Sequence, residues 1–183
     1  MPISEATYRM VALEDPEGKW ELYCGRLQSK PAMTYAHNKV SWVLGHWLQL
    51  QLSLDDYEIR VDAGRTERAS ESFFVPDVMV IPKALTRPLR GLRDVLEAYA
   101  EPLPLVVEVW SPSTGGYDAR TKLPEYQRRG DTEIWYIHPY DHTLTAWQRQ
   151  PDGSYREAQH AGGIVQPAAL PGVSIDLDAL FAI

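Results

Sequence analysis

A single acid within an apolar run constrains the fold of this 183-residue chain more than any other feature. Residues Leu105 to Trp110 read Leu-Val-Val-Glu-Val-Trp, and Glu108 is the one polar member. Nearly continuous apolar runs of this length are typical of strands that are buried on both faces of a helix-covered sheet. A buried carboxylate needs an ionic partner or a metal ion. The run therefore predicts a central strand that carries Glu108 in the core or at the open end of the strand.

Helical and strand-like patterns alternate along the chain. Apolar residues three and four apart predict helices over residues 4–14, 34–50, 88–100 and 115–129, the second with Thr34 as N-cap. The last should be kinked at Pro124 and end at Gly130. Strands are predicted over 20–23, 26–28, 57–62, 73–81, 105–110, 133–138, 143–148 and 155–159. Without a repeat or linker, this order predicts one α/β domain over residues 1–183, with a mixed central sheet and flanking helices.

The composition excludes some classes of protein. A formal net charge of −7 argues against a protein that coats nucleic acid through a broad basic face, but it does not exclude a nuclease whose acids lie in a metal pocket. No apolar run reaches the ~18 residues of a membrane span, and the N-terminus lacks the pattern of a signal peptide. The single Cys24 cannot form an internal disulfide, which favours the cytoplasm.

Two acids and a lysine occur in an order that indicates a metal-dependent phosphodiesterase. Asp77 follows Val75-Pro76 at the start of one strand, Glu108 lies in the next, and Lys122 lies on the helix that follows. Carboxylate oxygens hold a hard cation such as Mg²⁺, and a lysine can support the attacking water or the developing charge. Each residue also has a structural interpretation. Pro-Asp is common in turns, Glu108 could pair with a core Arg or Lys, and Asp118 with Lys122 could form a surface ion pair.

The same residues belong to a longer ordered pattern. It contains Glu21, His37, Val75-Pro76-Asp77-Val78, Val107-Glu108-Val109-Trp110-Ser111-Pro112-Ser113-Thr114, Asp118, Lys122, Tyr126, Gly130, Glu133 and Trp135. In this order the chain resembles the Uma-type family of "putative restriction endonucleases", a branch of the PD-(D/E)XK nuclease superfamily. The likeness extends from about Glu14 to Phe181.

The resemblance implies a restriction-endonuclease-like fold and a DNA-cleaving activity. Mg²⁺ or Mn²⁺ would be held by Asp77, Glu108 and the backbone carbonyl of Val109, and in-line attack would leave a 5′-phosphate. The superfamily usually places a lysine two residues after the second acid, where this chain has Trp110. The family is similar in placing its lysine on the following helix, at the position of Lys122, which would stabilise charge on the phosphorus.

Three residues have supporting roles in the resemblance. Glu21 is similar to an upstream acid that binds a second metal or orients water, and a hairpin ion pair is the alternative. His37 is more readily explained as a half-buried, satisfied histidine than as a catalytic one. Tyr126, one turn beyond Lys122, could close the pocket with its hydroxyl or simply pack in the core.

Two other functional classes fit the same sequence. A catalytically silent binding or regulatory module with a nuclease fold is favoured by the acidic net charge and by Trp110 in place of the strand lysine. A hydrolase of small phosphodiesters is the third. Six Trp and ten Tyr in a small chain also predict self-association into a homo-oligomer.

Overall fold

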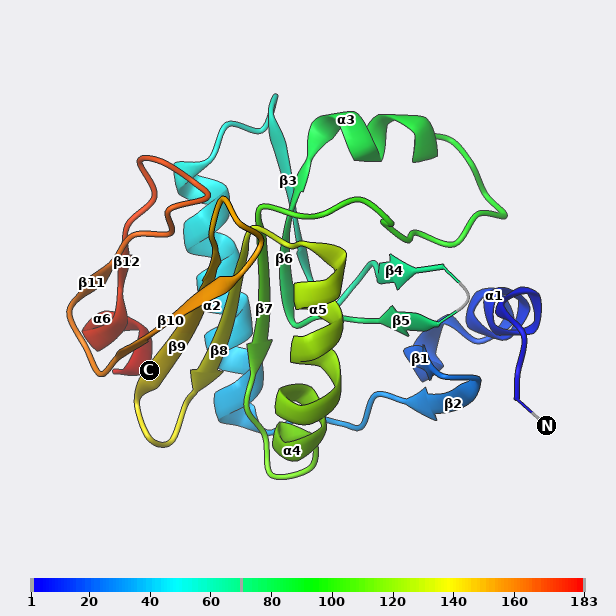
Figure 1. The fold of residues 1–183 in the computed structure, drawn as a ribbon, viewed down its shortest axis with the longest axis horizontal. Coiled ribbons are helices and arrows are strands. Elements are labelled where there is room, and N and C mark those ends of the chain that lie inside the picture. The colour runs from blue at the N-terminus through cyan, green and yellow to red at the C-terminus, as the bar shows by residue number, and fades with distance from the viewer. Residues whose placement is uncertain (1, 70, 183) are drawn as a thin grey trace.

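A six-stranded mixed sheet forms the centre of the computed structural model, which describes residues 2–69 and 71–182. The sheet has the order β10-β9-β8-β7-β6-β3, with α2 (Tyr35–Gln51) on one face and α5 (Leu123–Arg129) on the other (Figure 1). β7 and β8 are parallel, and the other neighbours in this sheet are antiparallel. The predicted mixed sheet with flanking helices is therefore confirmed. Its strands are β3 (Tyr57–Val61), β6 (Val78–Pro82), β7 (Leu105–Val109), β8 (Glu133–His138), β9 (Thr143–Arg149) and β10 (Tyr155–His160).

A smaller antiparallel sheet in the order β2-β1-β5-β4 lies beside the central one. It contains the predicted hairpin, in which Cys24 and Gly25 form the turn with φ angles of 48° and 73°. The elements outside the central sheet are α1 (Glu5–Glu14), η1 (Pro16–Gly18), β1 (Trp20–Tyr23), β2 (Arg26–Ser29), β4 (Thr66–Arg68), β5 (Ser72–Phe74), β11 (Ile164–Val165), β12 (Ile175–Asp176) and α6 (Leu177–Phe181). Within the described ranges, no helix is long and apolar enough to cross a membrane.

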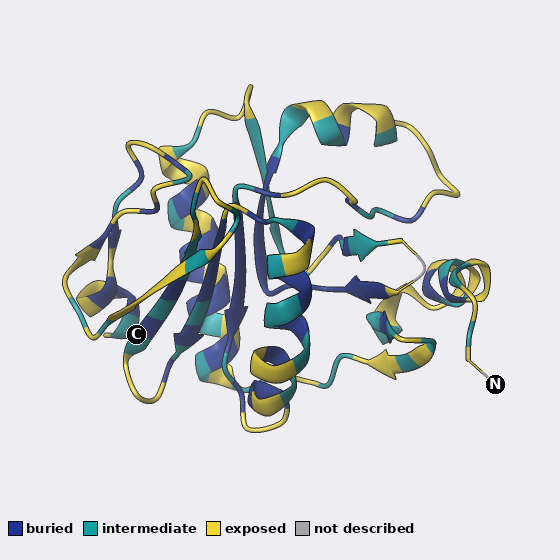
Figure 2. Cartoon of the chain, in the orientation of Figure 1, coloured by how far each residue is buried: buried dark blue, intermediate teal, exposed yellow. Residues whose placement is uncertain are grey.

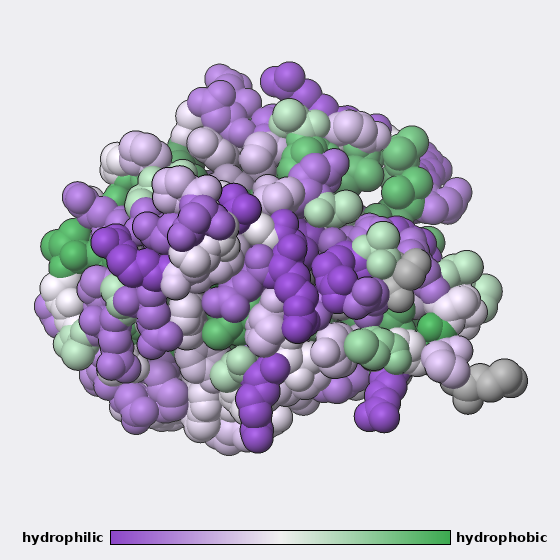
Figure 3. Space-filling view, viewed as in Figure 1, coloured by the Kyte–Doolittle hydropathy of each residue, from purple (hydrophilic) through white to green (hydrophobic). Residues whose placement is uncertain are grey.

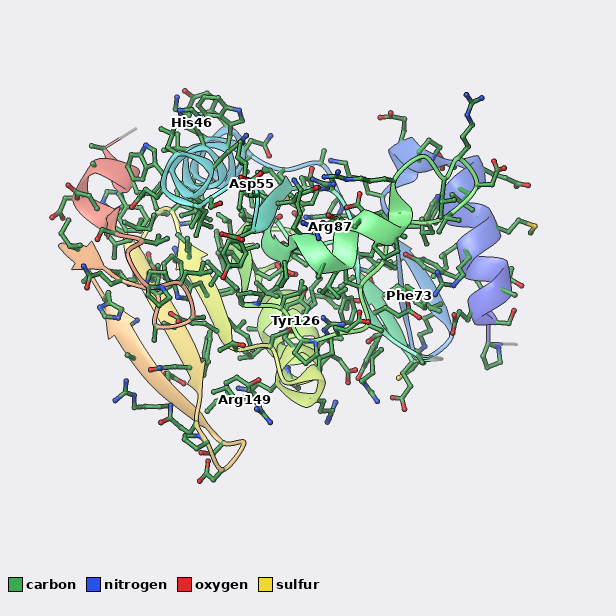
Figure 4. The ribbon with its side chains drawn as sticks, turned by 90° about the horizontal axis from the view of Figure 1, so that it is seen from above. His46, Asp55, Phe73, Arg87, Tyr126 and Arg149 are labelled. Atoms are coloured by element: carbon green, nitrogen blue, oxygen red, sulfur yellow. The ribbon has the colours of Figure 1, made fainter. Side chains whose placement is uncertain are left out.

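The alternation of side chains along β7 divides the core into two layers. Val107 and Val109 pack against the apolar face of α2, whereas Val106 packs with Tyr126 of α5 on the opposite face. All five residues of β7 are buried, which confirms the predicted central strand (Figure 2). Seen from above in Figure 4, His46 of α2 and Tyr126 of α5 lie on opposite sides of the strands. Thr34 caps α2 as predicted, by accepting a hydrogen bond from the backbone N–H of His37.

The prediction of a helix over residues 88–100 is wrong. The chain forms α3 (Lys83–Thr86) and one 3₁₀ turn, η2 (Arg87–Leu89), and then continues without a helix to Tyr99, which bridges Thr66. Leu96 and Tyr99 have helical spacing but are buried in two different clusters, so one helix face cannot hold both. Leu92 remains 54% exposed, and apolar residues gather on the surface over α3 and this loop (Figure 3).

The helix predicted over residues 115–129 consists of three parts. A short α4 (Gly115–Tyr117) leads into a π-helical segment, η3 (Asp118–Lys122), and then into α5. Pro124 lies in the first turn of α5, so the irregularity precedes the proline instead of forming a kink at it. Gly130 ends the helix with a φ of 83°, as predicted. The wider π turn places both Asp118 and Lys122 among the buried side chains.

Candidate active site

The site lies at the end of the central sheet where β6 begins and β7 ends. The ladder between these strands stops at the pair Val78–Val107, and Asp77 continues the contact with its side chain. Its Oδ2 accepts a hydrogen bond of 2.6 Å from the N–H of Val109, and its own N–H donates to the carbonyl of Val107. Residues two apart on a strand present backbone groups to the same edge, so the carbonyl of Val109 also faces Asp77.

Asp77 is fully buried and is held by two cationic or potentially cationic side chains. Nζ of Lys30 lies 2.6 Å from Oδ1, and Nε2 of His37 lies 3.0 Å from Oδ2, although the His37 contact is not aligned as a hydrogen bond. Burial by itself raises the pKa of Asp77, but the charge of Lys30 and the contact with His37 outweigh it and hold that pKa well below its usual range. Asp77 is therefore an ionised carboxylate.

Glu108 lies on the α5 side of the sheet and has a different environment. Its carboxylate accepts a short hydrogen bond from the hydroxyl of Tyr126 and lies 3.3 Å from Nζ of Lys122. Burial raises the pKa of Glu108 well above its usual range, and the neighbouring charges of Asp118 and Asp77 add to the rise against the opposing charge of Lys122. The two acids at the centre of the site thus have pKa values that are shifted in opposite directions.

Lys122 is shared among three carboxylates. Its Nζ lies 2.9 Å from Glu21 and 3.2 Å from Asp118, in addition to the contact with Glu108. Burial by itself lowers the pKa of Lys122. The charges of the three carboxylates raise this pKa by more than burial lowers it, so the ammonium group stays charged. Glu21 also accepts a hydrogen bond from the backbone N–H of Val75, which fixes β1 next to the segment that leads to Asp77.

The structure brings together all seven side chains that the sequence singled out. Three details differ from the expectations. Glu21 forms its ion pair with Lys122 and not within its own hairpin, and His37 is buried instead of half-buried. Tyr126 combines both of its interpretations, because the ring packs in the core while the hydroxyl reaches Glu108. The π turn also makes Asp118 and Lys122 a buried pair and not a surface pair.

Lys30 was missed from the sequence. It follows β2, its side chain is only 3% exposed, and its Nζ contacts Asp77, Asp62 and the carbonyl of Val75. Nothing in the local pattern signals this burial, because Lys30 stands between a short exposed strand and Pro31, where a lysine is normally solvated. The raised pKa of Lys30 has the same origin as that of Lys122: the charge of Asp77 outweighs the effect of burial.

The buried charges do not balance. Four carboxylates, those of Glu21, Asp77, Glu108 and Asp118, face only two ammonium groups, those of Lys30 and Lys122. When all four carboxyl groups are ionised and His37 is neutral, two negative charges are left over, and one divalent cation would compensate them. Among the described residues, Oδ1 of Asp118 also has no hydrogen-bond partner, although it lies near Lys122. Oxygen donors with excess negative charge suit Mg²⁺ or Mn²⁺.

The ammonium groups of Lys30 and Lys122 lie against the carboxylate oxygens of Asp77 and Glu108. Among residues 2–69 and 71–182, no group of three His, Cys, Asp or Glu side chains is arranged to hold a metal ion. A cation at Asp77 and Glu108 therefore requires Lys30 and Lys122 to move aside, while their charges stay in the site. The carboxylate oxygens are donors of the kind that a hard cation prefers, and their arrangement suits such a cation once Lys30 and Lys122 have moved aside.

A small cavity and a surface hollow lie close to the site. Next to Glu108 and Asp118 lies a cavity of about 10 Å³, the space of a single water molecule. On the Asp77 side, a surface hollow of about 360 Å³ is lined by Lys19, Lys30 and Asn38. The carboxylates of Glu17 and Asp62 line the same hollow, and Asp62 pairs with both lysines, so the lining has no excess of positive charge.

Comparisons with known proteins identify the family and the fold of this chain. Residues 5–178 match the Uma2 family, which is described as "Putative restriction endonuclease". A crystal structure of a protein from Anabaena variabilis, described as a "putative nuclease", shares the fold with a TM-score of 0.73 and 15% sequence identity, over 91% of each chain. No curated protein gave a match. Since the family match spans nearly the whole chain, this protein belongs to the Uma2 family, whose description and fold support a nuclease-like function.

Proposed function

We propose that this protein is a divalent-metal-dependent endonuclease that hydrolyses phosphodiester bonds in DNA. One observation carries the proposal: a buried cluster of four carboxyl groups and two ammonium groups lies at the end of the central sheet, with an excess of two negative charges once all four acids are ionised. The family description supports the reaction class, because it names a restriction endonuclease. The exposed free thiol of Cys24 is consistent with a cytoplasmic location.

Asp77, Glu108 and the backbone carbonyl of Val109 would hold Mg²⁺ or Mn²⁺. When bound, the ion would polarise the scissile phosphate and lower the pKa of a coordinated water. Asp77 supplies an oxygen that is already ionised, while Glu108 must lose its proton to become a ligand. His37 lies next to Asp77 and would fix the orientation of that carboxylate.

Lys122 would stabilise the charge that develops on the phosphate. Its ammonium group stays protonated because Glu21 and Asp118 flank it, so it can donate hydrogen bonds but cannot act as the base. Tyr126 donates to Glu108 and holds it on the side of Lys122. Lys19, whose side chain is 40% exposed at the hollow, would meet an incoming phosphate oxygen before the buried Lys30.

A catalytically silent binding module is the second candidate. The closed ion pairs of Asp77 with Lys30 and of Glu108 with Lys122 favour it, since they satisfy the acids without a metal ion. Under this alternative the protein would bind its partner equally well with and without a divalent cation.

Cleavage of plasmid DNA separates the two candidates. Purified protein with Mg²⁺ or Mn²⁺ at low salt should nick or linearise supercoiled plasmid, and EDTA should stop the reaction. Glu108→Gln, purified in the same way, is the matched control because it removes one ligand charge at nearly constant volume. Equal activity in the wild type and this variant would identify the cleavage as contamination and would leave the binding module as the better account.

A further inference from the structure

Three aromatic side chains gather at the same end of the sheet as the candidate site. Trp110 directly follows Val109, whose N–H binds Asp77. The ring of Trp110 stacks on His138 with 4.3 Å between centroids, and the ring of Tyr140 meets Trp110 edge-on at 5.8 Å. Tyr140 is 51% exposed, so this aromatic cluster of Trp110, His138 and Tyr140 reaches the surface.

The backbone reserves space for the Trp110 ring. A Cβ atom at Gly115 would lie 2.0 Å from Nε1 of Trp110, so only glycine allows the ring to pack against α4. The hydroxyl of Tyr136 donates a hydrogen bond of 2.9 Å to the carbonyl of Gly115 and fixes that segment. Trp110 is thus held in position, and a ligand that stacks on the cluster would not have to order this ring.

The aromatic cluster adjoins the hollow at the candidate site. The hydroxyl of Tyr140 hydrogen-bonds to Oγ1 of Thr34, and the preceding residue, Met33, lines the hollow together with Lys19. Near Trp110, Arg120 donates to the carbonyl of Gly116, and its guanidinium has no carboxylate partner among the residues that the structure describes. Aromatic rings next to cationic groups are the two features with which proteins hold a single strand of nucleic acid.

From this arrangement we infer that the aromatic cluster binds an unpaired base next to the scissile phosphate, so that the substrate is a single-stranded or locally unpaired DNA strand. A base inside an intact duplex is already stacked on its neighbours through both faces, so neither face is free to stack on an aromatic side chain of the protein. Stacking also supplies affinity that does not depend on charge, which suits a chain of net charge −7. This inference rests on the proposed function and specifies its substrate class.

Binding in EDTA tests the inference without any requirement for cleavage. Fluorescence anisotropy is measured with a labelled oligothymidine, an abasic oligomer of the same length and the corresponding duplex. The wild type should bind oligothymidine about tenfold more tightly than either of the other two, because only oligothymidine offers free bases. Trp110→Ala and Tyr140→Ala should each remove most of this difference, and Trp110→Phe should retain most of it.

Trp42→Ala is the matched control. Trp42 is an exposed tryptophan that also stacks on a histidine, His46, but lies on the outer face of α2. Circular dichroism checks that each variant is folded. If Trp110→Ala does not fold, Tyr140→Ala still tests the inference. Equal binding of all three probes, or unchanged oligothymidine binding in the folded Tyr140→Ala protein, would overturn the inference. Selective binding without cleavage would instead contradict the proposed function and leave the inference standing.

Discussion

The two central acids differ in how they contribute to stability. Asp77 is ionised and paired with Lys30, whereas Glu108 is buried with its pKa raised. Mutual repulsion between two neighbouring acids predicts that neutral variants of both would be more stable without metal. The contacts now support that expectation for Glu108 only, because Asp77 has its own cation.

Asp77→Asn should therefore destabilise the metal-free protein, and Glu108→Gln should stabilise it at neutral pH. The first change leaves Lys30 with only the partly exposed Asp62, and breaking a buried pair costs about 3–5 kcal/mol. Glu108→Gln removes a carboxyl group whose ionisation is unfavourable in the folded state. Urea unfolding in EDTA measures both differences, and a loss in Glu108→Gln as large as that in Asp77→Asn would contradict this assignment.

The pH dependence of these differences follows from the signs of the shifts. The folded-state pKa of Glu108 is raised, so its favourable contribution is complete below the unfolded value of about 4.5 and is lost as the pH rises through the folded value. The folded-state pKa of Asp77 is lowered, so its contribution is complete above the unfolded value of about 3.8 and is lost only in stronger acid. Hence the advantage of Glu108→Gln should grow as the pH rises above about 4.5, whereas the deficit of Asp77→Asn should stay constant over the same range.

Lys122 should matter for turnover and not for metal binding. Lys122→Met keeps most of the side-chain volume but removes the donor near the phosphate, so the rate of cleavage should fall by about 10²-fold or more. The affinity for Mn²⁺ should not weaken, because the variant removes positive charge from three carboxylates. Single-turnover cleavage and Mn²⁺ titration give the two quantities. A wild-type cleavage rate would make Lys122 only an ion-pair partner.

At the scale of elements, the position of α2 depends on close contact with the sheet. A Cβ atom at Gly45 would lie 2.3 Å from Cγ2 of Val61 on β3, and the branched valine side chain has little freedom to move. Gly45→Leu should therefore lower the free energy of unfolding by about 1–3 kcal/mol or more. It should also reduce activity, because α2 carries His37. Gln49→Leu, on the exposed side of the same helix, is the control for the added side chain, and equal stability of the two variants would contradict the packing argument.

The sequence predicts elements well where burial alone shapes the pattern. The strand around Glu108 was predicted because burial of both of its faces makes the sequence almost continuously apolar. The helix capped by Thr34 was predicted because burial of one face spaces its apolar residues three and four apart. The segment from Gly91 to Tyr99 was mispredicted because Leu96 and Tyr99 serve different clusters, a long-range property. The π turn at Asp118 was also not predicted, although it places Asp118 and Lys122 among the buried side chains. Lys30 was missed because its burial depends on contacts with Asp62 and Asp77, which lie far away in the sequence.

At the scale of the whole molecule, net charge limits how DNA can approach. A chain of net charge −7 offers a phosphate only a few cations near the site, such as Lys19 and Arg120. With two or three phosphate contacts, DNA affinity should fall about tenfold or more between ~50 and ~200 mM salt. Anisotropy titrations with the inactive Glu108→Gln protein measure this dependence. A flat response to salt would show that phosphate contacts do not contribute to binding.

The fold accommodates most of the aromatic residues that suggested self-association. Trp135, Tyr8, Tyr99 and Tyr126 are fully buried, while Tyr35, Trp42 and Tyr140 remain exposed. Among the described residues, the aromatic side chains that count as exposed lie on α2 and in the turn that follows β8, and homo-oligomerisation stays a prediction.

Calorimetric titration with Mn²⁺ tests the central claim most directly, because the claim is that the excess charge around Asp77 and Glu108 forms a metal site. The wild type should bind one or two ions weakly, and both Asp77→Asn and Glu108→Gln should abolish that binding while remaining folded by circular dichroism. Asp152→Asn is the matched control, since Asp152 is an exposed turn carboxylate far along the chain from the site. Binding that is unchanged in both site variants, or absent in the wild type, would contradict the account.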